Sequence, residues 1–214
     1  MGVKTVTTEK RSCWIFGGAP VSGDYKIIPP SDAYLIAADS GFSLLKRMGI
    51  MPDLVLGDFD SLTEDKPTGC EILTAAAEKD DTDTMLAIKT ALARGYTDIT
   101  IAGSVGGRLD HTFANIQSLA YILDNGANGR LMGENDTAEL FGAGDYRFLK
   151  NEKMYFSLFS YSGEAVVTTR GTKYDLDSYC LTSSFPLGVS NEILSPECTL
   201  KIEKGRVLVI FSKK

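Results

Sequence analysis

Two short runs of aspartates lie close together in the first half of the chain. The first, 57-GDFDSL-62, follows an apolar run, and the second, 79-KDDTDTML-86, leads into another. Asp58 and Asp60 are two residues apart, so in an extended turn their carboxylates point to the same side. Clustered carboxylates repel one another unless a cation offsets their charge, and hard oxygen ligands suit Mg²⁺ shared with substrate phosphates. A solvated acidic loop is the alternative, but the apolar neighbours and the second cluster favour a metal–phosphate site.

The second acidic run also has a structural interpretation. Asp80 and Asp83 are three residues apart at the expected start of a helix, so they lie on neighbouring faces. Acidic side chains at a helix N-terminus also complement the helix dipole. Asp81 is expected to do only that, or to face solvent.

Two glycine-containing segments are candidates for binding phosphate. The segment 103-GSVGGRLDH-111 follows an expected strand and leads into a helix, where backbone N–H groups and the helix dipole favour an anion. Gly17-Gly18 is a weaker signal of the same kind. Arg108 has two possible partners, a phosphate or the carboxylate of Asp110. His111 is the only histidine, which makes Ser-His or Cys-His catalysis improbable and excludes a histidine-rich metal site.

Composition narrows the class of protein. The chain has 214 residues, 43% of them hydrophobic and 23% charged, with a formal net charge of -6. This net negative charge disfavours nucleic acid and anionic membranes as partners, because both are anionic and bind basic patches. The four cysteines are scattered without a C-x-x-C pair, and neither a signal peptide nor an apolar run of transmembrane length is present. We therefore expect a soluble cytoplasmic protein that uses neither membrane nor nucleic acid.

Strands and helices are expected to alternate in the first half. The expected strands are 13–16, 33–37, the start of 53–62, 70–75, 98–103 and 130–133, and the expected helices are 42–49, 82–95 and 109–126. Phe113, Ile116, Leu119, Ala120 and Leu123 share one side of the last helix. Such alternation predicts a Rossmann-like, mostly parallel sheet with helices on both faces.

Ligand sites in such sheets form beyond the carboxyl ends of the strands. Gly17-Gly18, Asp39, Asp58, Asp60 and the glycine-rich segment at 103–108 each follow an expected strand. We therefore expect them to gather along one edge of the sheet.

From about Thr137 the alternation of expected strands and helices ends, and no further helix is expected. Short β-rich segments separated by turns predict an antiparallel β-sandwich or barrel, with strands at 137–141, 154–160, 164–169, 198–202 and 206–211. The expected organisation is an α/β domain at 1–136 followed by a β domain at 137–214.

The motifs together resemble thiamine pyrophosphokinase. In this order and spacing, the resemblance rests on 38-ADSG-41, 53-DLVLGDFDSL-62, 79-KDDTD-83, 103-GSVGGRLDHTFANI-116, 170-RGTKYDL-176 and 188-GVSNEI-193. It spans nearly the whole chain. The combination of D-x-x-x-G-D-x-D-S with G-G-R-x-D-H is highly specific, whereas either motif alone is only suggestive.

The resemblance implies transfer of a pyrophosphoryl group from ATP to the hydroxyl of thiamine, giving thiamine diphosphate and AMP. It implies an α/β domain followed by a β-sandwich, and a homodimer whose thiamine lies between the α/β domain of one subunit and the sandwich of the other. By motif match it assigns these residues: catalytic Asp39, Asp58, Asp60 and Asp83; Mg²⁺ ligands Asp58, Asp60 and Asp83; nucleotide-binding Gly17, Gly18, Lys79, Asp80, Arg108, Asp110 and His111; thiamine-binding Ser190 and Asn191.

This sequence departs from the family pattern in two places that bear on substrates. Lys79 stands where some members carry Gln, which leaves the nucleotide preference open. Some members stack a C-terminal tryptophan on thiamine, whereas Trp14 in the first strand is the only tryptophan here. Tyr174, Tyr179 and Phe185 are the aromatic alternatives.

Two other classes of protein are alternatives to a transferase. A non-catalytic nucleotide- or thiamine-binding module would not require all of the aspartates. A Rossmann-type oxidoreductase is disfavoured because its dinucleotide fingerprint is absent.

Overall fold

The computed structural model describes residues 12–23, 27–57, 69–74 and 81–214. Four residues of the predicted site, Asp58, Asp60, Lys79 and Asp80, lie outside these ranges. Within the described ranges, no helix has both the length and the apolar composition that a membrane span requires.

The first half alternates between strands and helices as predicted. Its elements are β1 (Ser12–Phe16), β2 (Tyr34–Ala38), α1 (Gly41–Arg47), β3 (Leu54–Gly57), β4 (Glu71–Thr74), α2 (Asp83–Ala93), β5 (Asp98–Ala102), α3 (Leu109–Asp124) and β6 (Asn128–Met132). The six strands pair in parallel in the order β4-β3-β2-β1-β5-β6. The expectation of a parallel sheet is confirmed.

Helices cover both faces of this sheet. Side chains alternate along each strand, so each strand contributes to one core layer on either face. Cys13 and Ile15 of β1 are fully buried in one core layer that includes Ile88 of α2 and Ile122 of α3. Trp14 and Phe16 point the other way, into a layer that includes Phe42, Leu44 and Leu45 of α1.

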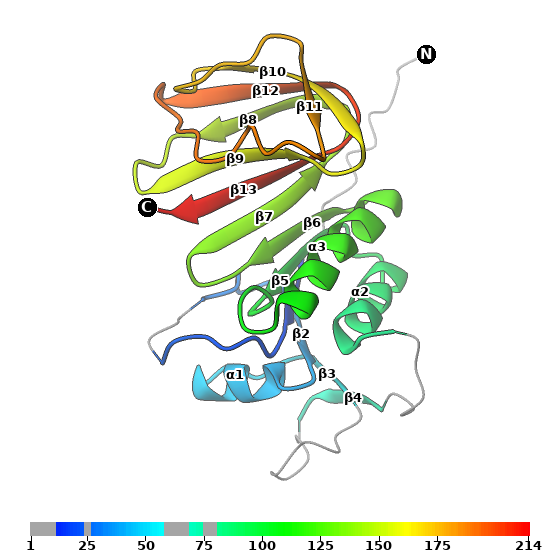
Figure 1. Cartoon of the computed structure of the whole chain (residues 1–214). Coiled ribbons are helices and arrows are strands. Elements are labelled where there is room, and N and C mark those ends of the chain that lie inside the picture. Colours follow the sequence, from blue (N-terminus) through cyan, green and yellow to red (C-terminus); the bar gives the residue numbers. More distant parts are fainter. Residues whose placement is uncertain (1–11, 24–26, 58–68, 75–80) are drawn as a thin grey trace, which may run out of the picture.

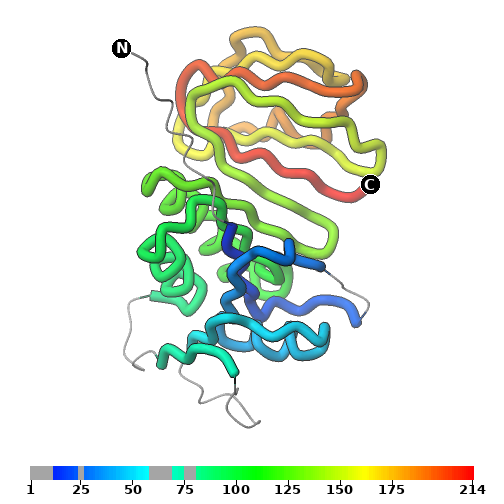
Figure 2. The backbone as a smooth tube through the Cα atoms, turned by 180° about the vertical axis from the view of Figure 1, so that it is seen from behind, coloured from blue at the N-terminus to red at the C-terminus, as the bar shows by residue number. Residues whose placement is uncertain are grey.

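The second half consists of strands, and its 137–214 range contains no helix. The strands are β7 (Asp136–Phe141), β8 (Gly144–Leu149), β9 (Met154–Ser160), β10 (Glu164–Arg170), β11 (Tyr179–Thr182), β12 (Glu197–Lys204) and β13 (Val207–Lys213). Figure 1 shows them stacked at one end of the molecule, with the helices confined to the other end, and Figure 2 shows the same division from behind.

The central sheet runs through both halves of the chain. β7 pairs antiparallel with β6, and the sheet continues as β7-β13-β9 to a total of nine strands. The predicted boundary between residues 136 and 137 therefore falls inside β7. The chain changes from helix-covered parallel strands to antiparallel strands there, without a break in the hydrogen-bonded sheet.

A second sheet of four strands, β11-β10-β12-β8, completes a sandwich. Phe156, Leu158 and Val209 of the central sheet pack in one core with Val167 and Leu200 of the second sheet. The predicted β-sandwich is confirmed in this form.

Helix α3 packs most of its predicted apolar side against the core: Leu119 is buried there, and Ile116, Ala120 and Leu123 are partly buried against it. Its buried residues are Asn115, Ser118, Leu119 and Ile122. Phe113 is 60% exposed, although it belongs to the apolar set of the sequence pattern. The helix therefore carries apolar side chains both toward the core and toward solvent.

Candidate functional site

A pocket of about 620 Å³ lies at the carboxyl edge of the parallel strands. Its walls come from the segments after β1, β2 and β5 and from the starts of α2 and α3. It brings together six of the predicted site residues: Gly17, Gly18, Asp39, Asp83, Arg108 and His111. The expected gathering along one sheet edge is confirmed for Gly17-Gly18, Asp39 and the segment at 103–108, whereas Asp58 and Asp60 lie outside the described residues.

The floor of the pocket is made of two loops that run in close contact. The Gly17 N–H donates to the Ala102 carbonyl at 2.8 Å, and the Ala19 N–H donates to the Gly103 carbonyl at 2.9 Å. A Cβ added to Gly17 would lie 2.9 Å from the Gly103 carbonyl oxygen. Only glycine at this position lets the two backbones approach this closely.

Asp39 has a strained backbone at the pocket wall. Its φ is 50°, in the left-handed region that non-glycine residues rarely adopt. Its N–H donates to the Leu56 carbonyl at 2.8 Å, which ties it to the end of β3. Ser178 and Ser190 are the other described non-glycine residues with positive φ. Such strain concentrates at functional sites, and Asp39 and Ser190 are both predicted site residues.

Asp83 is the first residue of α2, and the helix start fixes its position. The Thr82 side chain caps the helix by accepting a hydrogen bond from the Met85 N–H at 3.1 Å. Asp81 forms an ion pair with Lys89 at 2.6 Å and does not line the pocket. The structure thus separates the neighbouring carboxylates: Asp83 lines the pocket, and Asp81 pairs with Lys89 outside it.

Arg108 lines the pocket but is paired with Asp110 in this structure. Its guanidinium donates to both carboxylate oxygens of Asp110, at 3.1 and 2.6 Å. The hydrogen bond from Arg108 lowers the pKa of Asp110, and the same bond raises the pKa of Arg108. The two side chains are 73% and 64% exposed, and exposed pairs of this kind contribute little stability. Arg108 can therefore exchange Asp110 for an anionic ligand at low cost.

Five polar pocket residues were not among the predicted site residues: Ser40 after β2, Thr82 and Thr84 of the α2 start, Ser104, and Asn115. The buried Asn115 amide donates to the Ser104 carbonyl at 2.8 Å, and the Ser104 hydroxyl donates to the Ile101 carbonyl at 2.8 Å. These bonds fix the loop after β5 to α3. The signal in the sequence was the helical spacing of Asn115 with the apolar residues Leu119 and Ile122.

Ser190 and Asn191 lie in the β-sandwich and are not among the residues that line this pocket. The Ser190 side chain is exposed, and its N–H donates to the Ser157 hydroxyl at 3.0 Å. The Asn191 side chain is 7% exposed, and its amide binds the loop at 172–174. It accepts from the Tyr174 N–H at 3.1 Å and donates to the Tyr174 carbonyl at 2.9 Å. Asn191 thus holds a loop, while Ser190 is exposed at the surface.

An ion-pair cluster follows these two residues. Glu192 pairs with Lys173 at 2.9 Å and also with Lys214. Hydrogen bonds from Lys214 and Lys173 lower the pKa of Glu192 to about 2. The cluster joins the segment after Ser190 to the loop after β10 and to the end of β13.

Comparison with known proteins matches both halves of the chain. Residues 27–130 match the family model "Thiamin pyrophosphokinase, catalytic domain", and residues 146–207 match "Thiamin pyrophosphokinase, vitamin B1 binding domain". A thiamine pyrophosphokinase of Bacillus subtilis is 34% identical over 203 residues, which cover 89% of this chain and 95% of that protein.

Solved structures show the same likeness. The crystal structure of thiamine pyrophosphokinase from Bacillus subtilis aligns with a TM-score of 0.86 and 30% identity, covering 95% of this chain and 100% of the other. Thiamin pyrophosphokinase from Candida albicans aligns with a TM-score of 0.76 over 96% of this chain and 90% of the other. At 15% identity this last match shows a common fold only.

Proposed function

Because the chain belongs to the thiamin pyrophosphokinase family, we propose that it transfers a pyrophosphoryl group from ATP to the hydroxyl of thiamine. The products are thiamine diphosphate and AMP, and the reaction depends on Mg²⁺. The observation that carries this proposal is the pocket at the carboxyl edge of the sheet, which Asp39, Asp83 and Arg108 line together with two glycine loops.

The pocket residues have distinct roles in this proposal. The loop after β5 receives the phosphates, since it leads into the N-terminus of α3 and backbone N–H groups there favour anions. Gly17 and Gly18 form the adjoining wall of the pocket. Arg108 leaves Asp110 to pair with a phosphate, and His111 lines the nucleotide side of the pocket. Lys79 and Asp80, outside the described residues, are proposed for the nucleotide as well.

The described carboxylates fit a hard divalent cation. Asp39 and Asp83 line the same pocket and supply oxygen ligands of the type that Mg²⁺ prefers. The described residues alone contain no group of three or more potential metal ligands, so the proposed ligand set needs Asp58 and Asp60 beside Asp83. When bound, Mg²⁺ neutralises triphosphate charge that an acidic protein would otherwise repel. The aspartates hold the cation, and the glycine loops and Arg108 position the phosphates.

Thiamine is assigned to the β-sandwich at Ser190 and Asn191. The exposed Ser190 is proposed as a direct contact, and the buried Asn191 as the residue that shapes the site. Neither residue lines the nucleotide pocket of the same chain. This separation supports a site completed by a second subunit, as the family resemblance implies.

The test of this function is a reaction containing ATP, Mg²⁺ and thiamine. ATP consumption that depends on thiamine, with formation of thiamine diphosphate, is the expected result. Thiamine binding by calorimetry without any ATP consumption would favour the non-catalytic binding module. Absence of both binding and turnover would remove thiamine as the substrate.

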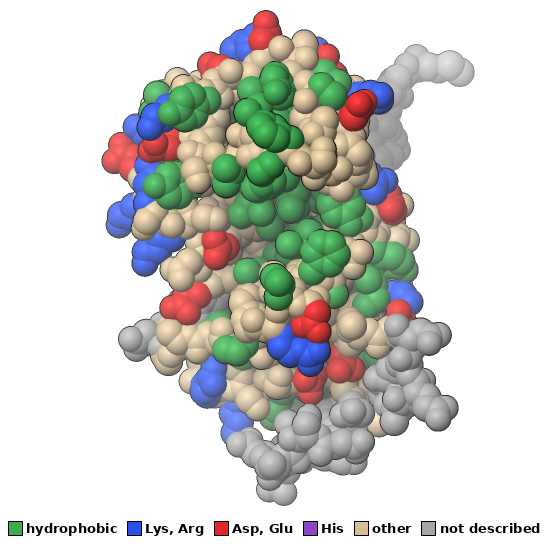
Figure 3. All heavy atoms as spheres, in the orientation of Figure 1, with side chains coloured by type: hydrophobic (Ala, Val, Ile, Leu, Met, Phe, Trp, Pro, Cys, Tyr) green, Lys and Arg blue, Asp and Glu red, His purple; other side chains and the backbone are tan. Residues whose placement is uncertain are grey.

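The surface supports the proposed homodimer. Leu109, Phe113 and Tyr121 are exposed along α3, and Phe185, Leu187 and Val189 are exposed before Ser190. Figure 3 shows hydrophobic side chains running as a band across this face, from the sandwich to α3. Exposed apolar bands of this kind mark protein–protein contacts.

Phe113→Glu is expected to weaken the dimer. A buried interface aromatic replaced by a charge raises the dissociation constant by roughly 30-fold or more. Met51→Glu is the matched control, because Met51 is also an exposed apolar residue but precedes β3 outside this band. Sedimentation equilibrium measures both variants. A wild-type chain that is monomeric and fully active would contradict the shared site.

A further inference from the structure

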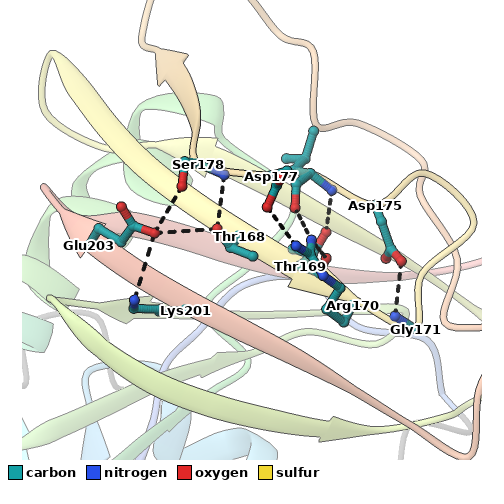
Figure 4. A network of polar contacts seen from close by, with 10 residues as sticks. Thr168, Thr169, Arg170, Gly171, Asp175, Asp177, Ser178, Lys201 and Glu203 are labelled. Atoms are coloured by element: carbon teal, nitrogen blue, oxygen red, sulfur yellow. Dashed lines mark hydrogen bonds and ion pairs between the residues drawn. The ribbon is translucent and has the colours of Figure 1, made fainter.

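The loop between β10 and β11 is held at its base by buried polar side chains. Thr169, Thr172 and Asn191 are all less than a tenth exposed. Buried polar groups of this kind must be hydrogen-bonded, and satisfied networks fix a single conformation. Figure 4 shows this region, with Asp175 pointing back at the backbone of Gly171.

Asp175 closes the turn by accepting three hydrogen bonds. Its carboxylate accepts from the Thr172 N–H at 2.8 Å, the Thr172 hydroxyl at 2.8 Å and the Gly171 N–H at 3.3 Å. Burial raises the pKa of Asp175, but the hydrogen bonds from Thr172 outweigh that effect and lower the pKa below its ordinary value. The ionised carboxylate is therefore the form that this turn selects.

The network passes from Asp175 to the segment around Ser190. The Thr172 hydroxyl donates to Asp175 and accepts from the Asn191 amide at 3.3 Å. That same amide binds both backbone groups of Tyr174. The backbone adds a second connection, because the Lys173 N–H donates to the Glu192 carbonyl at 2.8 Å.

The network therefore fixes an exposed surface. Tyr174 is 64% exposed, and the Lys173 ammonium lies 5.7 Å from the centre of its ring. Ser190 is exposed next to Asn191 in the sequence. An exposed tyrosine would ordinarily be free to move, but here its backbone is held on both sides.

We propose that Asp175 is a positioning residue for the thiamine site, which acts through Thr172 and Asn191 to hold Tyr174 and Ser190 in their binding arrangement. This inference rests on the proposed function, because thiamine is the ligand of that surface. Asp175 acts on the binding of thiamine and leaves the nucleotide pocket unchanged, because among the described residues its hydrogen bonds go to Gly171 and Thr172, neither of which lines that pocket.

The test compares Asp175→Ala with Asp175→Asn and with a control, Glu203→Ala. Glu203 accepts from Thr168 and Ser178 at 3.4 and 3.2 Å in the other polar cluster of Figure 4. Its loss removes a comparable set of bonds that does not lead to Asn191. Steady-state kinetics give the KM for thiamine, the KM for ATP and kcat for each protein.

Asp175→Ala should raise the KM for thiamine roughly tenfold, which is the scale of one lost hydrogen-bonded contact. The KM for ATP and kcat should stay within about threefold of wild type. Asp175→Asn keeps an acceptor oxygen for Thr172 and should recover most of the thiamine affinity. Glu203→Ala should leave both KM values unchanged.

Three outcomes would overturn the inference: an unchanged thiamine KM in Asp175→Ala, an equal rise in the KM for ATP, or the same rise in Glu203→Ala. If Asp175→Ala does not fold, Thr172→Val removes the same bridge while keeping the side-chain size, and the same criteria apply. A wild-type protein that neither binds nor converts thiamine would instead refute the proposed function. An active wild type with unaffected variants would refute only the role of Asp175.

Discussion

Asp83→Asn is expected to lower kcat by roughly 10²- to 10³-fold while leaving the fold and thiamine binding intact. Removing one preformed electrostatic contact to a transition state has effects of this size. The asparagine keeps the shape of the side chain but loses the charge that faces the pocket. The fold should survive, because Thr82 caps the helix and Asp83 does not.

Asp81→Asn is the matched control for this variant. The two carboxylates are two residues apart, but Asp81 pairs with Lys89 outside the pocket. Its side chain and that of Lys89 are 32% and 42% exposed, so the loss of the pair should change stability little. We expect kcat of Asp81→Asn to lie within about twofold of wild type. Equal losses in the two variants would show that charge near α2, and not the position of Asp83, matters.

Removal of divalent cations is expected to abolish turnover. The chain carries a formal net charge of -6, and the described pocket contains two carboxylates against one arginine. A triphosphate cannot enter such a site favourably without a cation to neutralise it. EDTA should therefore stop the reaction, and excess Mg²⁺ should restore it.

The same reasoning extends to Asp58 and Asp60, which lie outside the described residues. Asp58→Asn and Asp60→Asn should each lose most of the activity, and both should keep the circular dichroism spectrum of wild type. Full turnover in EDTA would refute the role of the metal for all three aspartates.

Much of the fold was predictable because apolar periodicity and turn signals agree in this chain. The predicted strand at 154–160 coincides with β9, and the strand at 164–169 coincides with all but the last residue of β10. β8 and β11 were not predicted. The sequence of β8, GDYRFL, carries charged residues and a leading glycine, and β11 has only four residues. Both depend on pairing with their neighbours, which local sequence does not show.

The candidate site was predictable where a residue follows a strand. Gly17, Asp39 and Arg108 gather as expected, because the topology brings the carboxyl ends of parallel strands to one edge. The hydrogen bond from the Asn191 amide to the Tyr174 carbonyl was not predictable, because the two residues are distant in sequence. The exposure of Phe113 was also not predictable. An apolar residue at helical spacing gives the same sequence pattern whether it packs in a core or lies on an exposed surface.

The identity of the phosphorylated products tests the central claim most directly. ³¹P NMR of a reaction containing ATP, Mg²⁺ and thiamine should show AMP and thiamine diphosphate rising together in equal amounts from the first turnovers. This result follows if the pocket positions the β-phosphorus for attack by the thiamine hydroxyl. Appearance of ADP together with thiamine monophosphate would contradict the account, because it would place the attack on the γ-phosphorus.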